Sequence, residues 1–350
     1  MNKYWSSRIK DMTPYVPGEQ PKEGEFIKIN QNENPYPPSP GALQAIRDAA
    51  TASLRIYPDP DCTEFREALA EFYGIKPEQV FVGNGSDEIL AFCYPAFFDS
   101  DILFADITYG FYPVYADFFN VSYKIVPLND DFTLPVQKFC EKNGGILIPN
   151  PNAPTGIALK RAEIETILQA NPDSVVVIDE AYVDFGTESA VPLIDQYENL
   201  LVVHTFSKAR SLAGLRVGFA LGNTELIEAL NCVKNSINSF TLDRGALAAA
   251  VASVRDRAYF ESTCQKVAAT RDKTAIRLRA LGFEMTDSTA NFLFVRHPQK
   301  RAEELYIALR ERGILVRYFN KPRIDDYLRI SIGTDEDMDA VIDALTSILG

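Results

Sequence analysis

Two apolar runs that stop abruptly in charge constrain the fold of this chain more than any other feature. Residues 175–182 read VVVIDEAY and residues 202–208 read VVHTFSK, so Asp179 and Lys208 follow apolar segments of strand length. Such runs are typical of strands buried on both faces, as in a parallel sheet between two layers of helices. A lone carboxylate or ammonium at the end of a buried strand costs free energy unless something uses it.

Three more apolar runs also lead into polar residues. They are residues 80–82, 102–104 and 146–148, which lead into residues 83–88, Thr108 with Tyr109, and residues 149–156. In an open α/β sheet the ligand binds outside the carboxyl ends of the strands. If the five runs are parallel neighbours, their polar ends meet in one crevice. A ligand with a basic ring nitrogen and an aldehyde would use both Asp179 and Lys208 there.

The order of the remaining patterns predicts two lobes. Strands alternate with helical stretches from Val80 to about Gly222, which is typical of an α/β lobe. Helical patterning then continues to about Leu281. Two strands follow, each with a helix after it, at residues 291–296, 301–312, 327–332 and 335–349. The chain of 350 residues is long enough for a large lobe and a small C-terminal lobe.

Composition excludes several classes of function. The net charge of −13 argues against nucleic acid, which demands clustered Lys and Arg. The five cysteines contain no Cys-x-x-Cys pair, so free thiols in a reducing compartment are expected. No apolar run reaches the length of a membrane span, and residues 1–8 lack the core of a signal peptide. We therefore expect a cytoplasmic protein that binds neither nucleic acid nor a membrane.

The two histidines leave little room for chemistry based on imidazole. A histidine-rich metal site is nearly excluded, and a Ser-His-Asp arrangement is disfavoured. His204 lies within a predicted strand and His297 directly precedes Pro298, so structural roles are expected for both. We expect no metal, and chemistry that depends on Lys, Asp, Tyr, Asn and Arg.

Lys208 and Asp179 each allow a structural and a chemical interpretation. Lys208 alone reads as a surface lysine at a strand end, but the small residues around it permit close approach of a flat ligand. An amine in a desolvated pocket loses its proton more readily, as a Schiff-base nucleophile requires. Asp179 alone could cap a helix or a turn. Opposite a pyridine nitrogen, its carboxylate would keep that nitrogen protonated.

The remaining candidates are weaker. The loop at residues 83–88 resembles a phosphate cradle before a helix, although Glu88 stands where a dinucleotide fingerprint has its third glycine. Ser86 as a plain helix cap is the alternative. Structural alternatives also remain for Tyr109 and Tyr182 as core aromatics, for Asn152 as a turn cap, and for Arg317 and Arg329 as solvated cations or anion ligands.

Several of these segments resemble a known family. Residues 150–156, 179–182 and 205–208, with Arg216, resemble the signature of fold-type I aminotransferases, which use pyridoxal 5′-phosphate. Within that superfamily, further segments resemble the histidinol-phosphate aminotransferases, namely residues 14–15, 32–35, 55–59, 108–112 and 327–334. The resemblance spans nearly the whole chain. It departs at Ala153, where relatives often carry a second polar residue.

The resemblance implies an α/β fold of the pyridoxal-phosphate-dependent transferase type I. A large domain would hold a mostly parallel seven-stranded sheet between helices, and a smaller domain would be α+β. Residues 1–30 would form an N-terminal segment that packs with the small domain and the active site. Residues 31–255 would form the large cofactor-binding domain, and residues 256–350 the small domain.

The resemblance also implies roles for single residues. Lys208 would hold the cofactor as a Schiff base and act with Asp179 and Tyr182 in catalysis. Asp179 would pair with the ring nitrogen, Asn152 and Tyr182 would bond the 3′-oxygen, and Tyr109 would stack on the ring. The other cofactor contacts would come from Gly85, Ser86, Asp87, Glu88, Thr205, Ser207 and Arg216, and from Tyr57 of a neighbouring subunit in a homodimer. Substrate would contact Tyr15, Asn32, Arg317 and Arg329.

The implied reaction is a transamination in histidine biosynthesis, between glutamate and imidazole-acetol phosphate, which gives 2-oxoglutarate and histidinol phosphate. An aromatic amino-acid aminotransferase or a threonine-phosphate decarboxylase of the same fold is the alternative. A nicotinamide-dependent oxidoreductase is disfavoured because the third glycine is missing. A pyridoxal-binding protein without catalysis is the remaining hypothesis.

Overall fold

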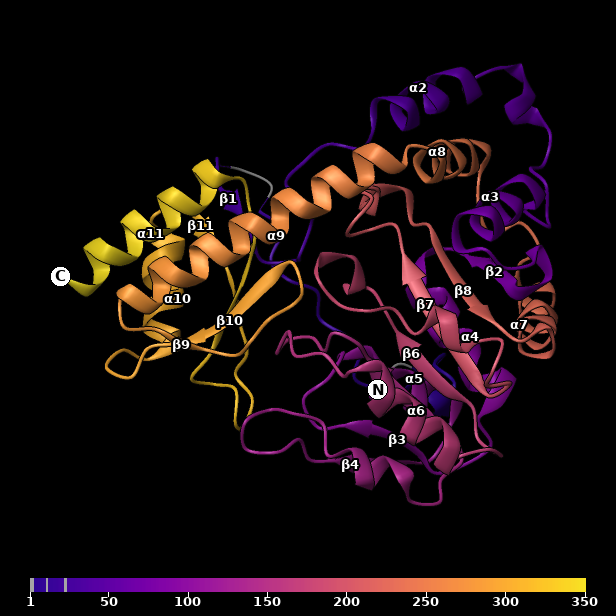
Figure 1. Ribbon diagram of the computed structural model, residues 1–350, viewed down its shortest axis with the longest axis horizontal. Helices are drawn as coiled ribbons and strands as arrows, with labels where there is room; N and C mark the ends of the chain where they lie inside the picture. The colour runs from indigo at the N-terminus through magenta and orange to yellow at the C-terminus, as the bar shows by residue number, and fades with distance from the viewer. Residues whose placement is uncertain (1–2, 11, 22–23) are drawn as a thin grey trace.

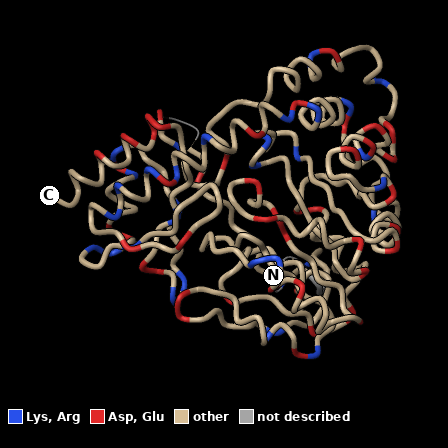
Figure 2. Tube along the Cα trace, viewed as in Figure 1, with Lys and Arg blue, Asp and Glu red and all other residues tan. Residues whose placement is uncertain are grey.

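The computed structural model describes residues 3–10, 12–21 and 24–350. Figure 1 shows a large lobe and a small lobe, with the long helix α9 (Arg257–Ala280) running from one to the other. Acidic and basic residues are interspersed over both lobes (Figure 2). No helix in these described ranges is both long and apolar enough to cross a membrane.

The large lobe is built on a mixed sheet that has seven strands among the described residues. In spatial order they are β2 (Val80–Gly83), β8 (Gly218–Gly222), β7 (Leu200–Thr205), β6 (Val176–Asp179), β5 (Ile146–Pro149), β3 (Ile102–Ala105) and β4 (Tyr123–Val126). The strands from β7 to β4 pair in parallel, whereas β8 is antiparallel to both β7 and β2. The fold is therefore α/β with a mostly parallel sheet, as expected.

The idea that all five apolar runs are parallel neighbours is wrong in one place. β8 lies between β2 and β7, so the strand before the glycine loop is not next to the strand before Lys208. β8 returns directly from β7 as an antiparallel partner, with Thr205 opposite Gly218. The loop after β2 still reaches the same edge of the sheet, because β2 and β7 are both antiparallel to β8 and thus point the same way.

Helices cover both faces of this sheet. They are α3 (Thr63–Tyr73), α4 (Gly85–Phe97), α5 (Phe111–Phe119), α6 (Arg161–Ala170), α7 (Thr224–Ile237) and α8 (Arg244–Arg255), while α2 (Pro40–Ala49) packs on α8. One core joins α3, α6 and α8 to strand residues such as Val176 and Ile178. The other core joins α4, α5 and α7 to residues such as Val177. Alternate residues of one strand thus enter opposite cores, which explains the unbroken apolar runs.

Short 3-10 turns connect several of these elements. They are η1 (Ala52–Arg55), η2 (Pro77–Gln79), η3 (Val136–Cys140), η4 (Val183–Phe185), η5 (Val191–Leu193) and η6 (Ala213–Leu215). α3 ends at Gly74, which adopts φ 70° at its C-terminus.

The small lobe combines an antiparallel sheet with helices. The sheet runs β12 (Arg317–Tyr318), β13 (Leu328–Ser331), β10 (Phe292–Arg296) and β9 (Glu284–Met285), and α9, α10 (Ala302–Glu311) and α11 (Asp335–Leu349) pack with it. The predicted last helix is present as α11, and its residues Met338, Val341, Ile342 and Leu345 are buried.

The N-terminal segment reaches the small lobe. A short helix, α1 (Ser7–Lys10), precedes β1 (Ile27–Lys28), and β1 pairs in parallel with β11 (Ile314–Leu315). Residues 1, 2, 11, 22 and 23 of the predicted segment 1–30 lie outside the described residues. The domain boundaries after residues 30 and 255 stay predictions. The second falls between the end of α8 and the start of α9.

Candidate active site at the carboxyl ends of the central strands

The carboxylate of Asp179 is buried where β6 ends. Its side chain is 5% exposed, its Oδ2 accepts a hydrogen bond from the Tyr112 hydroxyl at 3.1 Å, and its Oδ1 accepts from the Ala181 N–H at 3.2 Å. Burial raises the pKa of Asp179 to about 6, and the bond from Tyr112 is the strongest effect in the opposite direction. Asp179 thus does form a turn contact, but its second oxygen faces the interior.

Lys208 lies three residues beyond the neighbouring strand β7, whose Val203 stands opposite Asp179 in the sheet. The lysine Nζ donates to the Gln31 carbonyl at 2.8 Å and lies 5.9 Å from the centre of the Tyr182 ring. Burial, and next the charge of Arg329, lower the pKa of Lys208 to about 8. About a tenth of such an amine is neutral at pH 7. The structure therefore brings the predicted acid and amine to the same edge of the sheet.

A charged network lies at the start of α4. Arg216 Nη2 donates to Asp87 Oδ2 at 2.8 Å, and the Tyr109 hydroxyl donates to Asp87 Oδ1 at 2.6 Å. Arg216 Nη1 also donates to Ser207 Oγ at 3.2 Å, and Thr205 Oγ1 donates to the same oxygen at 3.0 Å. Burial, and next the charge of Asp87, raise the pKa of Tyr109 well above its ordinary value. Five predicted cofactor residues thus form one connected cluster.

The backbone at this helix start approaches its neighbours too closely for a side chain. Gly85 has φ 78°, and a Cβ on it would lie 2.6 Å from Arg216 Nη2. A Cβ on Gly218, in β8, would lie 2.4 Å from the Gly85 carbonyl carbon. The helix N-terminus, with its free N–H groups and an arginine beside it, is suited to bind an anion.

Ser86 is not the N-cap of α4. The helix begins at Gly85 and its N-cap is Asn84. Glu88 Oε2 accepts the Asn84 N–H at 2.6 Å, so this carboxylate stabilises the helix start itself. Desolvation raises the pKa of Glu88. A phosphate contact from Glu88 would therefore come from its backbone rather than its carboxylate.

Asn152 carries one buried atom without a partner. Its Nδ2 donates to the Ile107 carbonyl at 3.1 Å and to Thr155 Oγ1 at 2.9 Å, whereas its Oδ1 is buried without a hydrogen bond among the described residues. A buried acceptor without a partner costs free energy, and a ligand that donates a hydrogen bond to it would remove that cost. Rotating the amide by half a turn would turn Nδ2 in that direction, but it would set Oδ1 against the Ile107 carbonyl, which is also an acceptor.

Tyr182 lies between the two lobes of the chain. Its hydroxyl accepts from Asn32 Nδ2 at 3.0 Å, and its ring packs edge-on against Phe292 of β10 at 5.1 Å between centres. Burial is the main cause that raises the pKa of Tyr182, and Arg329 opposes it. The ring is thus held by packing while the hydroxyl faces the polar cluster.

The predicted substrate arginines face each other in the small lobe. Arg317 of β12 stands opposite Arg329 of β13. Arg329 Nη2 donates to the Asn30 carbonyl at 2.9 Å, its guanidinium lies 5.4 Å from the Phe292 ring, and its Nε is buried without a partner among the described residues. Burial lowers the pKa of Arg329. A buried guanidinium with an unused donor is suited to bind an anion.

Tyr15 approaches from the N-terminal segment. Its ring stacks on Phe111 at 4.3 Å and lies 6.4 Å from the Tyr109 ring. Tyr57 does not join this cluster within the same chain: it is 75% exposed and stacks on Phe240 at 4.4 Å. Tyr57 therefore lies on the surface, away from the predicted site residues whose contacts are described above.

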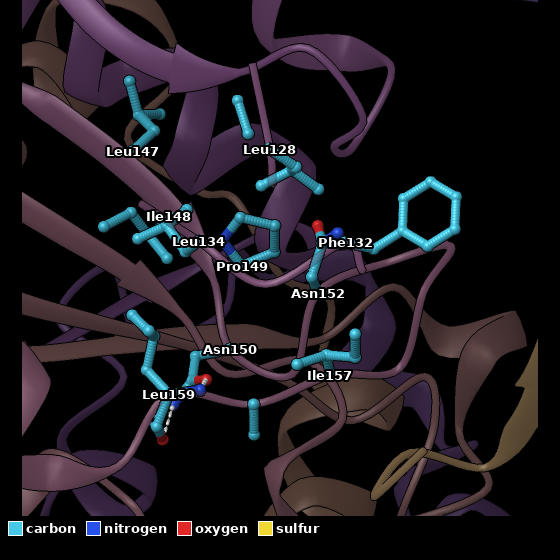
Figure 3. A pocket seen from close by; sticks show the side chains of 12 residues that line it. Leu128, Phe132, Leu134, Leu147, Ile148, Pro149, Asn150, Asn152, Ile157 and Leu159 are labelled. Atoms are coloured by element: carbon cyan, nitrogen blue, oxygen red, sulfur yellow. Dashed lines mark hydrogen bonds between the residues drawn. The ribbon is translucent and has the colours of Figure 1, made fainter. Parts of the chain in front are cut away.

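An apolar pocket of about 360 Å³ lies beside the turn that carries Asn152. Figure 3 shows Asn152 among apolar side chains such as Leu128 and Ile157. Neither Lys208 nor Asp179 lines it. Among the predicted site residues, Asn152 alone lines this pocket, which otherwise lies behind the turn.

The two histidines lie outside the crevice. His204 is buried in β7, stacks on Phe219 at 4.8 Å and has its Nε2 3.2 Å from Glu180 Oε2. His297 contacts the Leu281 carbonyl at 3.2 Å. No group of three or more possible metal ligands occurs in the described part of the chain.

Sequence reasoning missed Tyr112, Asn291 and Ser331. Tyr112 is fully buried and its hydroxyl reaches Asp179, while the other two side chains bind Asn32. The segment at residues 108–112 contained the one available signal, since a buried tyrosine hydroxyl needs a partner. Asn291 and Ser331 lie 259 and 299 residues from Asn32 in the chain, so no local sequence pattern indicates these contacts.

Comparison with known proteins adds to this geometry. The model of the family described as aminotransferase class I and II matches residues 24–345. The chain is 53% identical to the histidinol-phosphate aminotransferase of Clostridium acetobutylicum, with 99% of both chains covered. It is 58% identical to that of Acinetobacter baumannii strain SDF, covering 95% of this chain and 94% of the relative.

A solved structure is also similar over nearly the whole chain. It is the histidinol-phosphate aminotransferase from Sinorhizobium meliloti in complex with pyridoxal 5′-phosphate, with a TM-score of 0.87 at 25% identity. The alignment covers 99% of this chain and 98% of that one.

Proposed function

The chain belongs to the class I and II aminotransferase family, and we propose that it transfers an amino group between glutamate and imidazole-acetol phosphate, yielding histidinol phosphate. The relatives that share 53% and 58% of its residues carry the name of this activity. The observation that carries the chemistry is the placement of Lys208 and Asp179 at one edge of the sheet, on neighbouring strands.

The cofactor is pyridoxal 5′-phosphate, and the residues of the crevice fit it. Asp179 supplies a buried carboxylate for a ring nitrogen, and Asn152 and Tyr182 supply polar atoms for the ring oxygen. The glycine-lined start of α4 with Arg216 and Ser207 suits the phosphate. When bound, the cofactor supplies an aldehyde that reacts with amines and a ring that withdraws electrons from the adjacent carbon.

Lys208 would hold the cofactor covalently and move the proton. Its lowered pKa of about 8 leaves part of the amine neutral and therefore nucleophilic. The same Nζ would also be the base for the proton on the substrate α-carbon. The Gln31 carbonyl, at 2.8 Å, keeps the amine oriented.

Asp179 would act by charge and not by proton transfer. An ionised carboxylate opposite the ring nitrogen favours the protonated form of that nitrogen, and the dry surroundings strengthen this attraction. The hydrogen bond from Tyr112 favours the ionised form of Asp179 against the cost of burial.

The substrate end of the crevice suits anions. Arg329 and Arg317 would bind the phosphate of histidinol phosphate and, in the other half of the reaction, a carboxylate of glutamate, because a guanidinium pairs with both groups. Tyr15 and Asn32 would border the substrate. Phe292 and Phe319 flank Arg329, so an aromatic amino acid is the second candidate substrate.

We also propose a homodimer in the cytoplasm. Tyr57 would reach the phosphate of the neighbouring site, which is supported by its exposure and by the exposed apolar residues next to it, namely Leu54 and Ile56 in the chain and Phe240 across the fold. All five cysteines are free thiols, which suits a reducing compartment.

Initial rates with three substrates would test the assignment. We expect a higher kcat/KM for histidinol phosphate than for phenylalanine, no carbon dioxide from phosphothreonine, and ping-pong kinetics with 2-oxoglutarate. Preference for phenylalanine would contradict the substrate assignment, and a ternary-complex pattern would contradict the mechanism.

A further inference from the structure

We propose that Asn32, Ser331 and Asn291 form a buried hydrogen-bond lock that turns the hydroxyl proton of Tyr182 toward the cofactor. The inference deepens the proposed function and rests on it. The three residues are positioning residues: Asn32 borders the substrate with its polar groups turned to Ser331, Asn291 and Tyr182, so all three act on the reaction through Tyr182.

Every polar group of Asn32 has a partner. Its N–H donates to Ser331 Oγ at 2.9 Å, and its Oδ1 accepts from the Ser331 hydroxyl at 2.8 Å. Its carbonyl accepts from Asn291 Nδ2 at 2.9 Å, and its Nδ2 donates to the Tyr182 hydroxyl at 3.0 Å. Asn32, Ser331 and Asn291 are at most 1% exposed. Asn32 adopts φ 58°, a left-handed conformation that asparagine tolerates and most residues do not.

The serine fixes which way the Asn32 amide points. A backbone N–H can only donate, so Ser331 Oγ accepts from Asn32 and retains one proton to donate. That proton has Asn32 Oδ1 as its acceptor. If the amide were flipped, two donors would face Ser331 and its own proton would lose this acceptor, at the cost of an unsatisfied buried group. The amide NH₂ therefore faces Tyr182.

The polarity of this bond decides what Tyr182 can do. A phenol hydroxyl has one proton, and when a neighbour donates to its oxygen, that proton is free to point elsewhere. The groups that face Tyr182 are Lys208 at 5.9 Å from its ring centre, Arg329, Asp179 and Tyr15. The proton is thus available to the ring oxygen of a cofactor held by Lys208.

The lock also spans the two lobes. Asn32 follows β1, Ser331 ends β13 and Asn291 precedes β10, whereas Tyr182 follows β6 of the large sheet. The small lobe thereby sets the direction of a proton in the large lobe. Loosening the lock would change the electronic state of the cofactor without removing any residue that touches it.

Two variants with a matched control test the lock in the holoenzyme. Ser331→Ala frees the amide to flip, and Asn32→Asp replaces the donor with an acceptor of the same shape. Ser253→Ala is the control, because it removes a serine hydroxyl that is likewise buried, at 4% exposed, in α8. The readouts are the pH titration of the visible absorption of the bound cofactor, and kcat and KM for histidinol phosphate.

We expect the titration midpoint to rise by about one pH unit in Ser331→Ala and at least as much in Asn32→Asp, because a hydrogen bond donated to the ring oxygen favours its anionic form. We expect kcat to fall about tenfold with KM changed less than threefold. Ser253→Ala should leave the midpoint unchanged. In a Tyr182→Phe background, Ser331→Ala should add no further shift.

An unshifted midpoint in Asn32→Asp, or an undiminished effect of Ser331→Ala in the Tyr182→Phe background, would overturn the lock. If Ser331→Ala does not fold, the isosteric Asn32→Asp alone decides between these results. A failure of the proposed function would look different: the wild-type protein itself would fail to bind the cofactor or to turn over histidinol phosphate.

Discussion

Burial shifts the pKa values of Lys208 and Asp179 in opposite directions. The amine is moved down to about 8 and the carboxyl up to about 6, so each charged form is less favourable than it would be in water. Both groups regain favourable interactions when a ligand offers an aldehyde to one and a ring nitrogen to the other. Binding of such a ligand would offset the free energy that it costs to bury a carboxylate and an amine at the ends of adjacent apolar strands.

The pKa of Lys208 predicts how cofactor attachment depends on pH. The neutral amine is the nucleophile, so the attachment rate of cofactor-free protein should rise with pH and level off above about 8. Stopped-flow absorption would measure this rate. A rate that still rises about tenfold between pH 9 and pH 10 would indicate an ordinary lysine and contradict the shift.

Tyr112→Phe tests whether the hydrogen bond from the Tyr112 hydroxyl stabilises the ionised form of Asp179. Loss of the hydroxyl should raise the pKa of Asp179 further above about 6, weaken its attraction for the ring nitrogen, and lower kcat about tenfold. Nitrogen-15 NMR of a labelled cofactor should show less protonation of the ring nitrogen.

Tyr94→Phe is the control for this substitution. It removes an equally buried hydroxyl, which donates to the Tyr112 carbonyl at 2.6 Å and does not reach Asp179. The same loss of ring-nitrogen protonation in both variants would mean that Tyr112 acts only through packing.

Sequence reasoning was able to single out Lys208 and Asp179, because charge at the end of an apolar run is a local signal. It could not single out Tyr112, since one buried tyrosine among sixteen reads as core until its hydroxyl is seen to meet Asp179. The partners of Asn32 were hidden for another reason, namely the 299 residues that separate it from Ser331.

Among the elements, β8 does most to shape the proposed phosphate cradle. It was not among the five apolar runs, and neither was β4, whose Lys124 and Ile125 are exposed. β8 places Gly218 directly against the start of α4. The order of strands could not be read from the sequence, because pairing of β2 with β8 joins segments far apart in the chain.

Gly218→Ala should therefore disturb the cradle. Its Cβ would lie 2.4 Å from the Gly85 carbonyl carbon, so the two elements must separate, at a cost of about 1–3 kcal/mol. We expect cofactor affinity to fall at least tenfold, measured by titration of the cofactor-free protein. Gly41→Ala in α2 is the control, because its Cβ meets nothing within 4 Å; unchanged affinity in Gly218→Ala would contradict the role of β8.

At the scale of the whole molecule, the exposed patch around Tyr57 connects the fold to assembly. Leu54, Ile56 and Tyr57 are each more than half exposed, and the Tyr57 ring stacks on the partly exposed Phe240. Apolar side chains gathered in this way mark an interaction surface. A dimer would cover them and complete each phosphate site with a tyrosine from the partner.

Mixing two impaired variants tests this assembly. Lys208→Ala lacks the amine and should lose nearly all activity, and Tyr57→Ala should bind the cofactor at least tenfold more weakly. In a mixed dimer, one site has both Lys208 and an intact Tyr57 from the other subunit. At limiting cofactor, activity should therefore exceed that of either parent after subunit exchange. No gain in a dimer shown to have exchanged would contradict the shared site.

In the proposed active site, Lys208 and Asp179 bind opposite ends of one aromatic aldehyde. Borohydride reduction of the holoenzyme, followed by peptide mass mapping, tests it most directly. We expect loss of the yellow colour and one cofactor mass attached to the Lys208 Nζ, with attachment retained but the absorption altered in Asp179→Asn. Attachment at another lysine, or absorption that is unchanged in Asp179→Asn, would contradict the account.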